Sequence, residues 1–486
     1  MKAEAVVVGA GVDALVAAHY LARAGYAVTL VRERINGVED VLEPGWVPPE
    51  IVRALDLERH GLRIEQPDPW AMVMPEDGGL ELGADMAATV EAIAKLSAAD
   101  AARWPDFCTR MHALAGLLEA LYTGPPPDPL AGSRRELIGL ARTGLRVRSL
   151  GRGGMEDLFR LLPMSVADFL DDWFESDILK GVLGAAGVMH LAQGPRSGGT
   201  AFNLLHHHVG GAKGVFRPAL SNVRAVLARR DGVTVRTETV TRIDVRQGRA
   251  TGVTLDSGDE LHASLVVSGL APGRTLLELV DAAWLDPEFI RAVRNVRSRG
   301  AAAQVSLVLD RDPRFTRLVV APSLDYLERA YDPVKYGETS PQPYLEATNL
   351  GAEVAGRFRV QLHVQYVPHT PKDGAWDTAR SERLARAAVA RLSEDVPGLA
   401  GWVIDQHVLT PDDLLHIHGF PQGQQYHAEL ALDQVLWMRP TPQLAQYRTP
   451  IAGLYLCGPA MHPGGGIAGA AGANAASVIL RERPRR

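Results

Sequence analysis

The stretch Glu4-Ala5-Val6-Val7-Val8-Gly9-Ala10-Gly11-Val12-Asp13-Ala14 decides the fold. Its apolar, β-branched start is typical of a parallel strand buried on both faces. The pattern Gly-x-Gly-x-x-Ala follows, and the apolar residues from 15 to 22 then have helical spacing before a second strand at 27–31. This order predicts a βαβ unit, in which N–H groups at the start of the helix bind a pyrophosphate. The motif alone does not choose between NAD and FAD.

Length and composition indicate an enzyme-sized globular chain. The 486 residues exceed the roughly 250–300 residues of one core, so two domains are expected. Apolar residues make up 46% and charged residues 22%, and the net charge of −6 does not favour a nucleic-acid partner. Cys108 and Cys457 have no metal-binding spacing, which predicts a cytoplasmic chain without a structural metal.

Neither end of the chain reads as a targeting or membrane segment. Glu4 places an acid where a secretory signal carries only positive charge. Residues 451–480 lack Asp, Glu, Lys and Arg, but prolines, an asparagine and a run of three glycines interrupt them. We therefore expect a buried segment that faces a cofactor.

The remaining chain divides into helical and strand-rich blocks. Residues 45–194 are mainly helical with few strand signals, whereas strands are expected at 233–236, 240–245, 250–255 and 265–267. A second mixed block follows, with strands at 303–309 and 358–367, a helix near 381–394 and a last strand at 454–458. This pattern predicts a nucleotide domain built from 1–45, 195–290 and 440–486, and a substrate domain built from 46–194 and 291–439.

A second motif lies near the C-terminus. A strand end at Gly458 leads to His462-Pro463-Gly464-Gly465-Gly466-Ile467 and then to a helix rich in glycine and alanine. Small residues allow a backbone to approach a flat ring and another helix closely. The start of this helix would direct its positive dipole end at the ring of a reduced flavin.

These motifs resemble those of the phytoene desaturase-like family of FAD-dependent oxidoreductases, which includes carotenoid desaturases and relatives of the pyridine nucleotide-disulphide oxidoreductase-like type. The resemblance is carried by residues 6–11, 321–331, 453–458 and 462–466. Further similarity at Leu205-His206-His207 and at 430–434 extends it over nearly the whole chain.

The resemblance implies an α/β flavoprotein of the amine oxidase/phytoene desaturase-like type, with a Rossmann-like FAD-binding domain and an inserted α+β substrate domain. It also implies an enzyme with FAD as cofactor that moves hydride between an apolar small molecule and flavin N5, in bacterial biosynthesis. The cofactor-binding positions that it implies are Gly9, Gly11 and Ala14 for the pyrophosphate, Val240 for adenine, and Gly458, Gly464, Gly465, Gly466 and Ile467 for the flavin.

Several positions depart from the family pattern. Arg32 stands where the family has a ribose-binding glutamate, and Glu33 follows it, so Glu33 substitutes only by a register shift. An arginine there also suits the 2′-phosphate of NADP. Asn36 and Pro218 replace other family residues, and Asp13 puts a carboxylate beside the phosphates unless it turns away. Two alternatives therefore stay open, a flavin-free isomerase or cyclase and a non-catalytic ligand- or partner-binding subunit.

The sequence offers few catalytic candidates. His462 lies in the glycine turn, where it either orients the reactants or bonds to the backbone, and Tyr326 either lines the cavity or packs in the core. The run His206-His207-His208 resembles a metal tract, but adjacent residues point to different sides, so no metal site is expected. The expected partner is an apolar small molecule; a peripheral membrane contact and a homo-oligomer are left open, with no clear amphipathic anchor in the sequence.

Overall fold

A parallel sheet of five strands carries the N-terminal motif in the computed structural model, which describes residues 4–33, 45–74, 79–128, 134–211, 219–353 and 356–482. The strand order is β17-β11-β1-β2-β7, and every neighbouring pair is parallel. These strands come from the beginning, middle and end of the chain. They are β1 (Glu4–Val8), β2 (Ala27–Arg32), β7 (Thr234–Thr237), β11 (Leu265–Ser268) and β17 (Leu454–Leu456).

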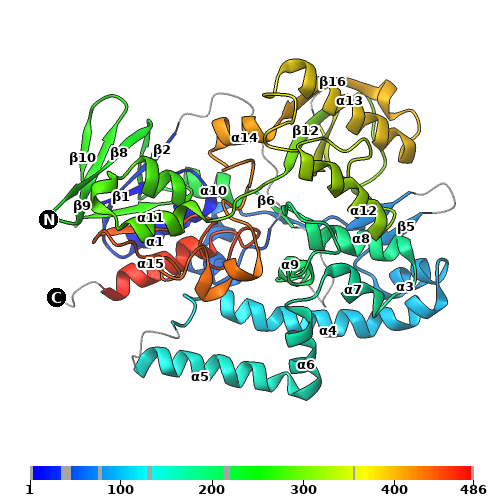
Figure 1. Ribbon diagram of the computed structural model, residues 1–486, viewed down its shortest axis with the longest axis horizontal. Helices are drawn as coiled ribbons and strands as arrows, with labels where there is room; N and C mark the ends of the chain where they lie inside the picture. The colour runs from blue at the N-terminus through cyan, green and yellow to red at the C-terminus, as the bar shows by residue number, and fades with distance from the viewer. Residues whose placement is uncertain are drawn as a thin grey trace.

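Two helices that are far apart in sequence lie side by side against this sheet (Figure 1). They are α1 (Val12–Arg23) and α15 (Ala470–Glu482), and they share one apolar core with the five strands. A small antiparallel sheet adjoins this core, formed by β8 (Val240–Arg246), β9 (Arg249–Leu255) and β10 (Glu260–His262). Gln247 and Gly248 both have positive φ, as expected of a tight hairpin turn between β8 and β9. The sequence-based strand predictions in this domain are confirmed.

The second domain is built on a seven-stranded sheet of order β16-β12-β15-β14-β13-β4-β5. One face packs under α13 (Thr378–Asp395) and forms a separate apolar core. The strands are β4 (Ala71–Val73), β5 (Leu80–Leu82), β12 (Ala302–Leu309), β13 (Arg317–Val320), β14 (Leu345–Ala352), β15 (Phe358–Gln365) and β16 (Val403–Leu409). The sequence analysis expected only β12 and β15 of this sheet and missed the other five strands. For β4 and β5 the reason is that three-residue strands inside a helical block carry almost no alternation.

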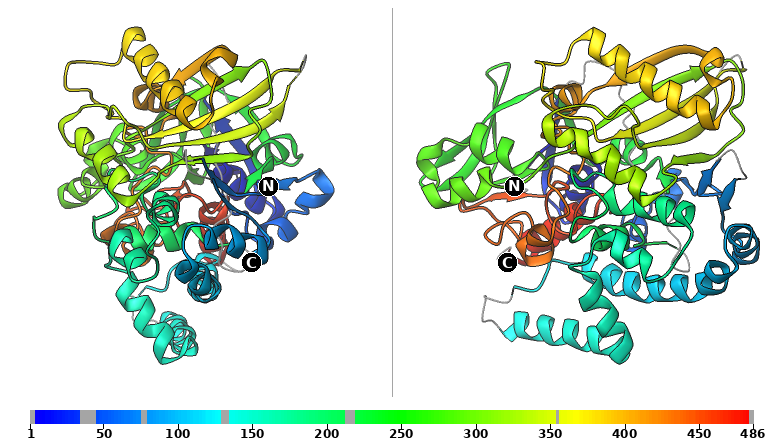
Figure 2. Two further views of the ribbon diagram at one scale, coloured as in Figure 1. Left: turned by 90° about the vertical axis from the view of Figure 1, so that its right-hand side faces the viewer. Right: turned by 45° about the vertical axis from the view of Figure 1, so that its right-hand side comes forward.

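Helices cover the lower half of this domain (Figures 1 and 2). Most of them pack around a third apolar core that includes Trp104 and Phe107, whereas α5 projects from the body. The helices are α3 (Met86–Ala94), α4 (Ala98–Tyr122), α5 (Arg134–Ser149), α6 (Gly151–Leu161), α7 (Val166–Asp171), α8 (Asp177–Val188), α9 (Thr200–His207) and α12 (Leu324–Tyr331).

The predicted domain boundaries do not coincide with the residues at which the chain passes from one apolar core to the other. Val47 and Ile51, beside and in α2 (Pro49–Ala54), belong to the core of the five-stranded sheet, although the boundary was placed before residue 46. Phe202 and Leu205 of α9 belong to the helical core of the second domain, although the boundary was placed before residue 195. Among the described residues, no helix is both long and apolar enough to cross a membrane.

Candidate functional site

The glycine loop after β1 has the geometry of an anion-binding helix start. Gly9 has φ +118°, a conformation that suits glycine, and its N–H donates to Val31 O at 2.8 Å. Gly11 directly precedes α1, and no described atom lies within 4 Å of the place where its Cβ would stand. No side chain of the described residues caps α1. Its first N–H groups are therefore available to a diphosphate.

Ala14 and Asp13 fit this role. Ala14 is buried against Gly269 at the end of β11, so the helix approaches the sheet closely. The carboxylate of Asp13 accepts the N–H of Gly472 at 3.3 Å, so it lies at the first turn of α15. The expected repulsion between Asp13 and the phosphates is thus resolved by the neighbouring helix, whose positive end the carboxylate faces.

The end of β2 holds a carboxylate, but one residue later than the family pattern. Arg32 is exposed, and its Nε donates to Thr237 Oγ1 at 3.1 Å. Glu33 forms an ion pair with Arg274, and both side chains are partly exposed. Val240 is buried at the start of β8 and pairs with Leu255. Asn36 and Pro218 lie outside the described residues. The ribose and adenine contacts of Arg32, Glu33 and Val240 stay predictions.

The glycines of the C-terminal motif pack closely against other residues of this protein. A Cβ on Gly458 would lie 2.3 Å from Gly269 O, and one on Gly465 would lie 1.8 Å from the Tyr426 ring. The flat ring beside Gly465 is thus a tyrosine of this chain. Gly466 lines a cavity, and the N–H of Trp46 donates to the carbonyl oxygen of Gly466 at 2.8 Å. Gly464 lies beside the Arg439 guanidinium, and Ile467 is buried.

The two catalytic candidates lie away from this cavity. His462 is fully buried, and its Nε2 donates to Leu121 O at 3.0 Å, so the ring points toward α4. Burial lowers the pKa of His462 to about 4, which leaves it neutral. The Tyr326 hydroxyl donates to Pro343 O at 2.9 Å and accepts from Arg391. Neither side chain lines the cavity, so the structure does not bring them together as a catalytic pair.

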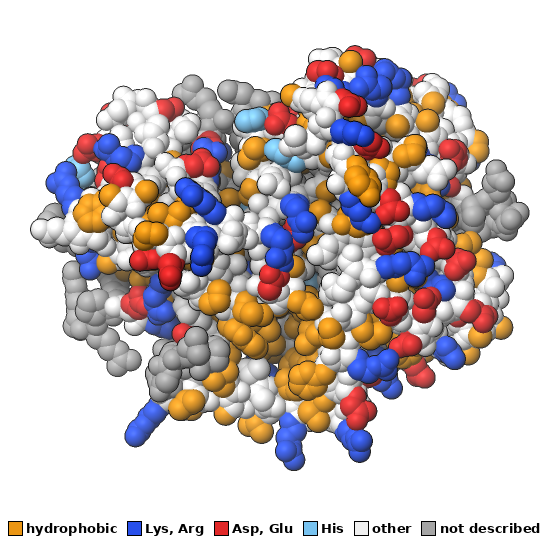
Figure 3. All heavy atoms as spheres, in the orientation of Figure 1, with side chains coloured by type: hydrophobic (Ala, Val, Ile, Leu, Met, Phe, Trp, Pro, Cys, Tyr) orange, Lys and Arg blue, Asp and Glu red, His pale blue; other side chains and the backbone are white. Residues whose placement is uncertain are grey.

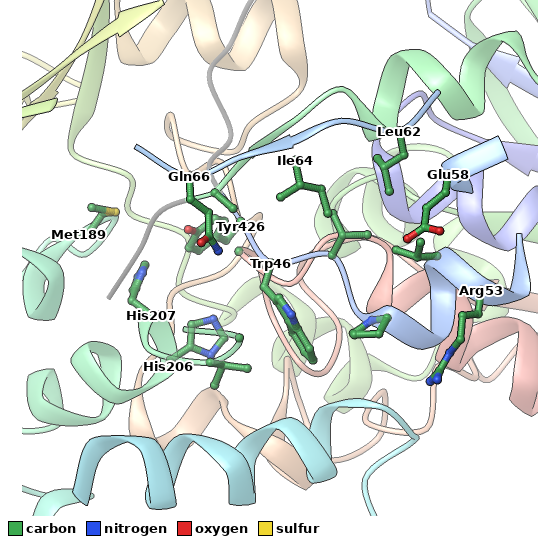
Figure 4. Close-up of a pocket in the computed structure, with 18 residues that line it drawn as sticks. Trp46, Arg53, Glu58, Leu62, Ile64, Gln66, Met189, His206, His207 and Tyr426 are labelled. Atoms are coloured by element: carbon green, nitrogen blue, oxygen red, sulfur yellow. The ribbon is translucent and has the colours of Figure 1, made fainter. Parts of the chain in front are cut away.

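The cavity has a volume of about 580 Å³ and spans both domains. Figure 4 shows Arg53 and Glu58 at one end and Met189 and His207 at the other, with Trp46 between them. The labelled lining residues are Trp46, Arg53, Glu58, Leu62, Ile64, Gln66, Met189, His206, His207 and Tyr426. The charged groups are therefore confined to one end, and the end nearer the glycine turn combines aromatic and apolar side chains with Gln66 and two histidines.

The three side chains of the run His206-His207-His208 have different partners in the structure. His206 Nε2 donates to Gly465 O at 2.8 Å, so its Nδ1 accepts from the Tyr122 hydroxyl at 2.9 Å. Burial lowers the pKa of His206 to about 4. His207 lines the cavity, and His208 bonds back to Leu204 O at 2.8 Å. His206 and His207 therefore both line the cavity, and only His208 points away from it.

Sequence reasoning missed Trp46, Met189 and Tyr426 as cavity residues. Each comes from a different segment, and none belongs to a local motif. The resemblance at Leu205-His206-His207 was a signal for the histidines, but it did not indicate that His206 and His207 line a cavity.

The crossing of α1 and α15 gives a first testable prediction. A Cβ on Gly472 would stand 1.9 Å from Asp13 O, a backbone atom, so Gly472→Ala must separate the two helices. We expect the free energy of unfolding to fall by about 2–3 kcal/mol and FAD to bind more weakly. Gly116→Ala is the control, because Gly116 is an exposed helical glycine with no described atom within 4 Å of an added Cβ. Chemical denaturation and FAD titration check the result, and equal behaviour of the two variants would contradict it.

Comparisons with known proteins agree with this geometry. The profile of the family described as flavin containing amine oxidoreductase matches residues 166–480. The chain is 31% identical over 542 residues to pyridine nucleotide-disulfide oxidoreductase domain-containing protein 2 of Rattus norvegicus, with 99% of this chain and 93% of that protein covered. It is 25% identical over 523 residues to the neurosporene-forming phytoene desaturase of Cereibacter sphaeroides, with 99% and 94% covered.

Solved structures share the fold. An oxidoreductase from Methanosarcina mazei superimposes with a TM-score of 0.58 at 15% identity, covering 99% of this chain and 100% of that one. Cyclohexylamine oxidase from Brevibacterium oxydans gives a TM-score of 0.55 at 15% identity, with 100% of both chains covered. The expected amine oxidase-like fold is confirmed. The chain belongs to the flavin containing amine oxidoreductase family and is an FAD-dependent oxidoreductase.

Proposed function

We propose that this enzyme moves a hydride between a carbon atom of an apolar small molecule and flavin N5, and that it serves a bacterial biosynthetic pathway. The observation that carries the hydride-transfer proposal is the cavity of about 580 Å³, which reaches Gly466 of the glycine turn and has Trp46, Met189 and Tyr426 in its wall. The resemblance to carotenoid desaturases supports the pathway proposal.

The described residues fit FAD at both ends. The open start of α1 at Gly11 suits the diphosphate, and the turn at Gly466, which borders the cavity, suits the flavin. FAD, when bound, supplies the hydride-accepting chemistry that the protein side chains lack. The chain itself then has to bind the substrate, orient it and keep water out.

The side chains of the inner cavity suit those tasks. Trp46, Met189 and Tyr426 offer apolar surface, whose burial stabilises a bound hydrocarbon by about 25 cal/mol per Å². His206 is held neutral by burial and is already bonded at both nitrogens, so it places no charge beside the substrate. Hydride transfer from an apolar carbon needs positioning more than a strong base.

The test starts with the visible spectrum of the purified protein and a titration with FAD. The loaded enzyme is then mixed anaerobically with a panel of apolar alkenes, cyclic terpenes and polyenes, and bleaching of the flavin absorbance is followed. Reduction by at least one apolar compound is expected. Reduction only by amines or other charged compounds would contradict the proposal, and a protein that binds no FAD would favour the flavin-free alternatives.

A variant sharpens this test. Met189→Gln adds polarity to the inner wall, so we expect KM for the apolar substrate to rise about ten-fold with little change in FAD affinity. Met86→Gln in α3, a half-buried methionine away from the cavity, is the matched control. An unchanged KM in Met189→Gln would count against substrate binding at this wall.

A peripheral membrane contact is proposed for α5, which the sequence analysis did not identify as an anchor. Leu137, Ile138 and Leu145 are 57%, 52% and 66% exposed on this projecting helix. Arg142 and Arg146 lie on the same helix, and Figure 3 shows basic and hydrophobic side chains together along the lower edge, where α5 lies. Exposed apolar residues beside arginines suit an anionic lipid surface.

We therefore expect the enzyme to float with vesicles that contain phosphatidylserine, and less with purely zwitterionic vesicles. Replacing Leu137, Ile138 and Leu145 by serine is expected to reduce the bound fraction at least five-fold. Ile404→Ser on β16, which changes another exposed apolar residue, is the control. A sedimentation measurement in the same buffer decides the alternative, in which α5 joins two copies of the chain as a homo-oligomer.

A further inference from the structure

The seven-stranded sheet has a polar face that is nevertheless buried. Its other face forms the apolar core under α13, and side chains alternate between the two faces along each strand. Gln304, Arg317 and Gln361 on the polar face are each 3% exposed, and Glu346 and Thr348 are also buried. Buried polar groups cost free energy unless they are hydrogen-bonded, so a polar face inside a protein calls for a reason.

The strand register gathers these groups into one patch. Gln304 on β12 pairs with His363 on β15, which pairs with Glu346 on β14. In the next row, Gln361 pairs with Thr348, which pairs with Arg317 on β13. Together with His190, these six residues form the polar wall of a small cavity.

The charges on this polar wall are already paired with each other. Arg317 forms an ion pair with Glu346 and donates to Trp70 O at 3.1 Å, and the Tyr344 hydroxyl donates to Glu346 at 2.5 Å. Burial lowers the pKa of His190 and of His363, so both rings are neutral. The wall thus offers hydrogen bonds without an unbalanced charge.

The cavity at this wall has a volume of about 30 Å³, close to the space that one water molecule occupies. Met189 lines both this cavity and the main one. The ring of His190 also lies 4.5 Å from the ring of Tyr426, which lines the main cavity. The two cavities are therefore neighbours, separated at Met189 by a flexible, unbranched side chain.

We propose that this small cavity is a subsite that takes one neutral polar group, a hydroxyl or a carbonyl, at the end of an otherwise apolar substrate. The inference rests on the proposed function, because it takes the main cavity as the place of the apolar body. A hydroxyl that replaces an ordered water keeps the hydrogen bonds of the wall. A carboxylate or an ammonium group would lose its hydration without finding an unpaired counter-charge, which disfavours it.

Three probes with one apolar body test the choice of end group on the FAD-loaded enzyme: 1-octanol, octanoate and octylammonium. Dissociation constants come from perturbation of the flavin absorbance and from calorimetry at pH 7.5. We expect octanol to bind at least ten-fold more tightly than either charged probe. Tighter binding of octanoate or octylammonium, or no binding of any probe, would overturn the inference.

A substitution in the polar wall tests whether this wall causes the preference for a neutral end group. Thr348→Val keeps the shape of the side chain and removes its hydroxyl, so octanol affinity is expected to fall about five- to ten-fold while octanoate affinity stays the same. Thr241→Val on β8, an exposed strand position in the other domain, is the matched control. Equal loss for both probes, or no loss, would overturn the assignment. Because binding is measured without turnover, a failure of flavin reduction leaves this test intact, so the two proposals fail separately.

Discussion

Replacing Arg439 by lysine is expected to lower the free energy of unfolding by about 3–5 kcal/mol and to weaken FAD binding. Arg439 is fully buried, and burial lowers its pKa to about 10, so it is still a cation at neutral pH. Its five N–H bonds go to backbone oxygens of two segments, residues 428–434 and residues 459–461 just before the glycine turn. The acceptors are Met461 O, Glu429 O, Gln434 O, Ala428 O and Pro459 O, at 2.9–3.2 Å.

Lysine cannot replace this arrangement, because it has three donors at one point where arginine has five in a plane. At least two buried carbonyl groups would lose their partner, and the turn at Gly464, which lies against the guanidinium, would lose its support. Urea denaturation and FAD titration measure the two effects. Arg448→Lys, at a partly exposed ion pair with Glu482, is the control and is expected to change stability by less than about 1 kcal/mol. Comparable losses in both variants would refute the role given to Arg439.

Local sequence patterns predicted the βαβ unit and the β8–β9 hairpin, because both are formed by residues close together in the chain. The βαβ unit follows from the spacing of Gly9, Gly11 and the helix after them, and the β8–β9 hairpin follows from its turn residues. Each of these signals lies within about 30 consecutive residues. The short strands β4 and β5 carry no such signal, because their place is set by pairing with β13, far along the chain.

The cavity could not be predicted in the same way. Trp46, Met189 and Tyr426 meet only through the tertiary packing of one apolar core, and no pattern links residues so far apart in sequence. The direction of a side chain was equally hidden: His462 stands in the expected turn but points toward α4. The sequence placed the carboxylate of Asp13 beside the phosphates, where it would oppose their binding. In the structure this carboxylate accepts the N–H of Gly472 at the start of α15.

The polar face of the seven-stranded sheet is buried, although its sequence pattern predicts an exposed face. Alternation such as Gln304-Val305-Ser306-Leu307 normally indicates one face in the core and one in water. Here both faces are buried, because the polar one closes the small cavity. Sequence alternation reports the chemistry of a face, and only the tertiary structure reports whether that face contacts solvent.

Acidification is expected to unfold this protein well above the pH at which carboxylates titrate. Burial lowers the pKa to about 4 for four buried histidines, against an ordinary value of 6.5. They are His206, His208, His427 and His462. Between pH 6.5 and 4 the unfolded chain binds protons at these four sites that the folded chain does not. Their contribution to stability is therefore complete above pH 6.5 and is lost as the pH falls toward 4.

The size of the effect follows from this linkage. Each such histidine costs about 1.4 kcal/mol per pH unit at most, so four of them remove on the order of 5 kcal/mol per unit near pH 5. The unfolding midpoint is then expected between about pH 5 and 6, followed by circular dichroism. In His208→Gln, which changes a histidine away from the cavity, the slope of unfolding free energy against pH should fall by the share of one histidine, at most about 1.4 kcal/mol per pH unit, and exposed His416→Gln is the control. Stability that stays flat from pH 8 to pH 5 would show that these histidines accept protons within the fold, and the neutral bonding assigned to His206 at the glycine turn would then be wrong.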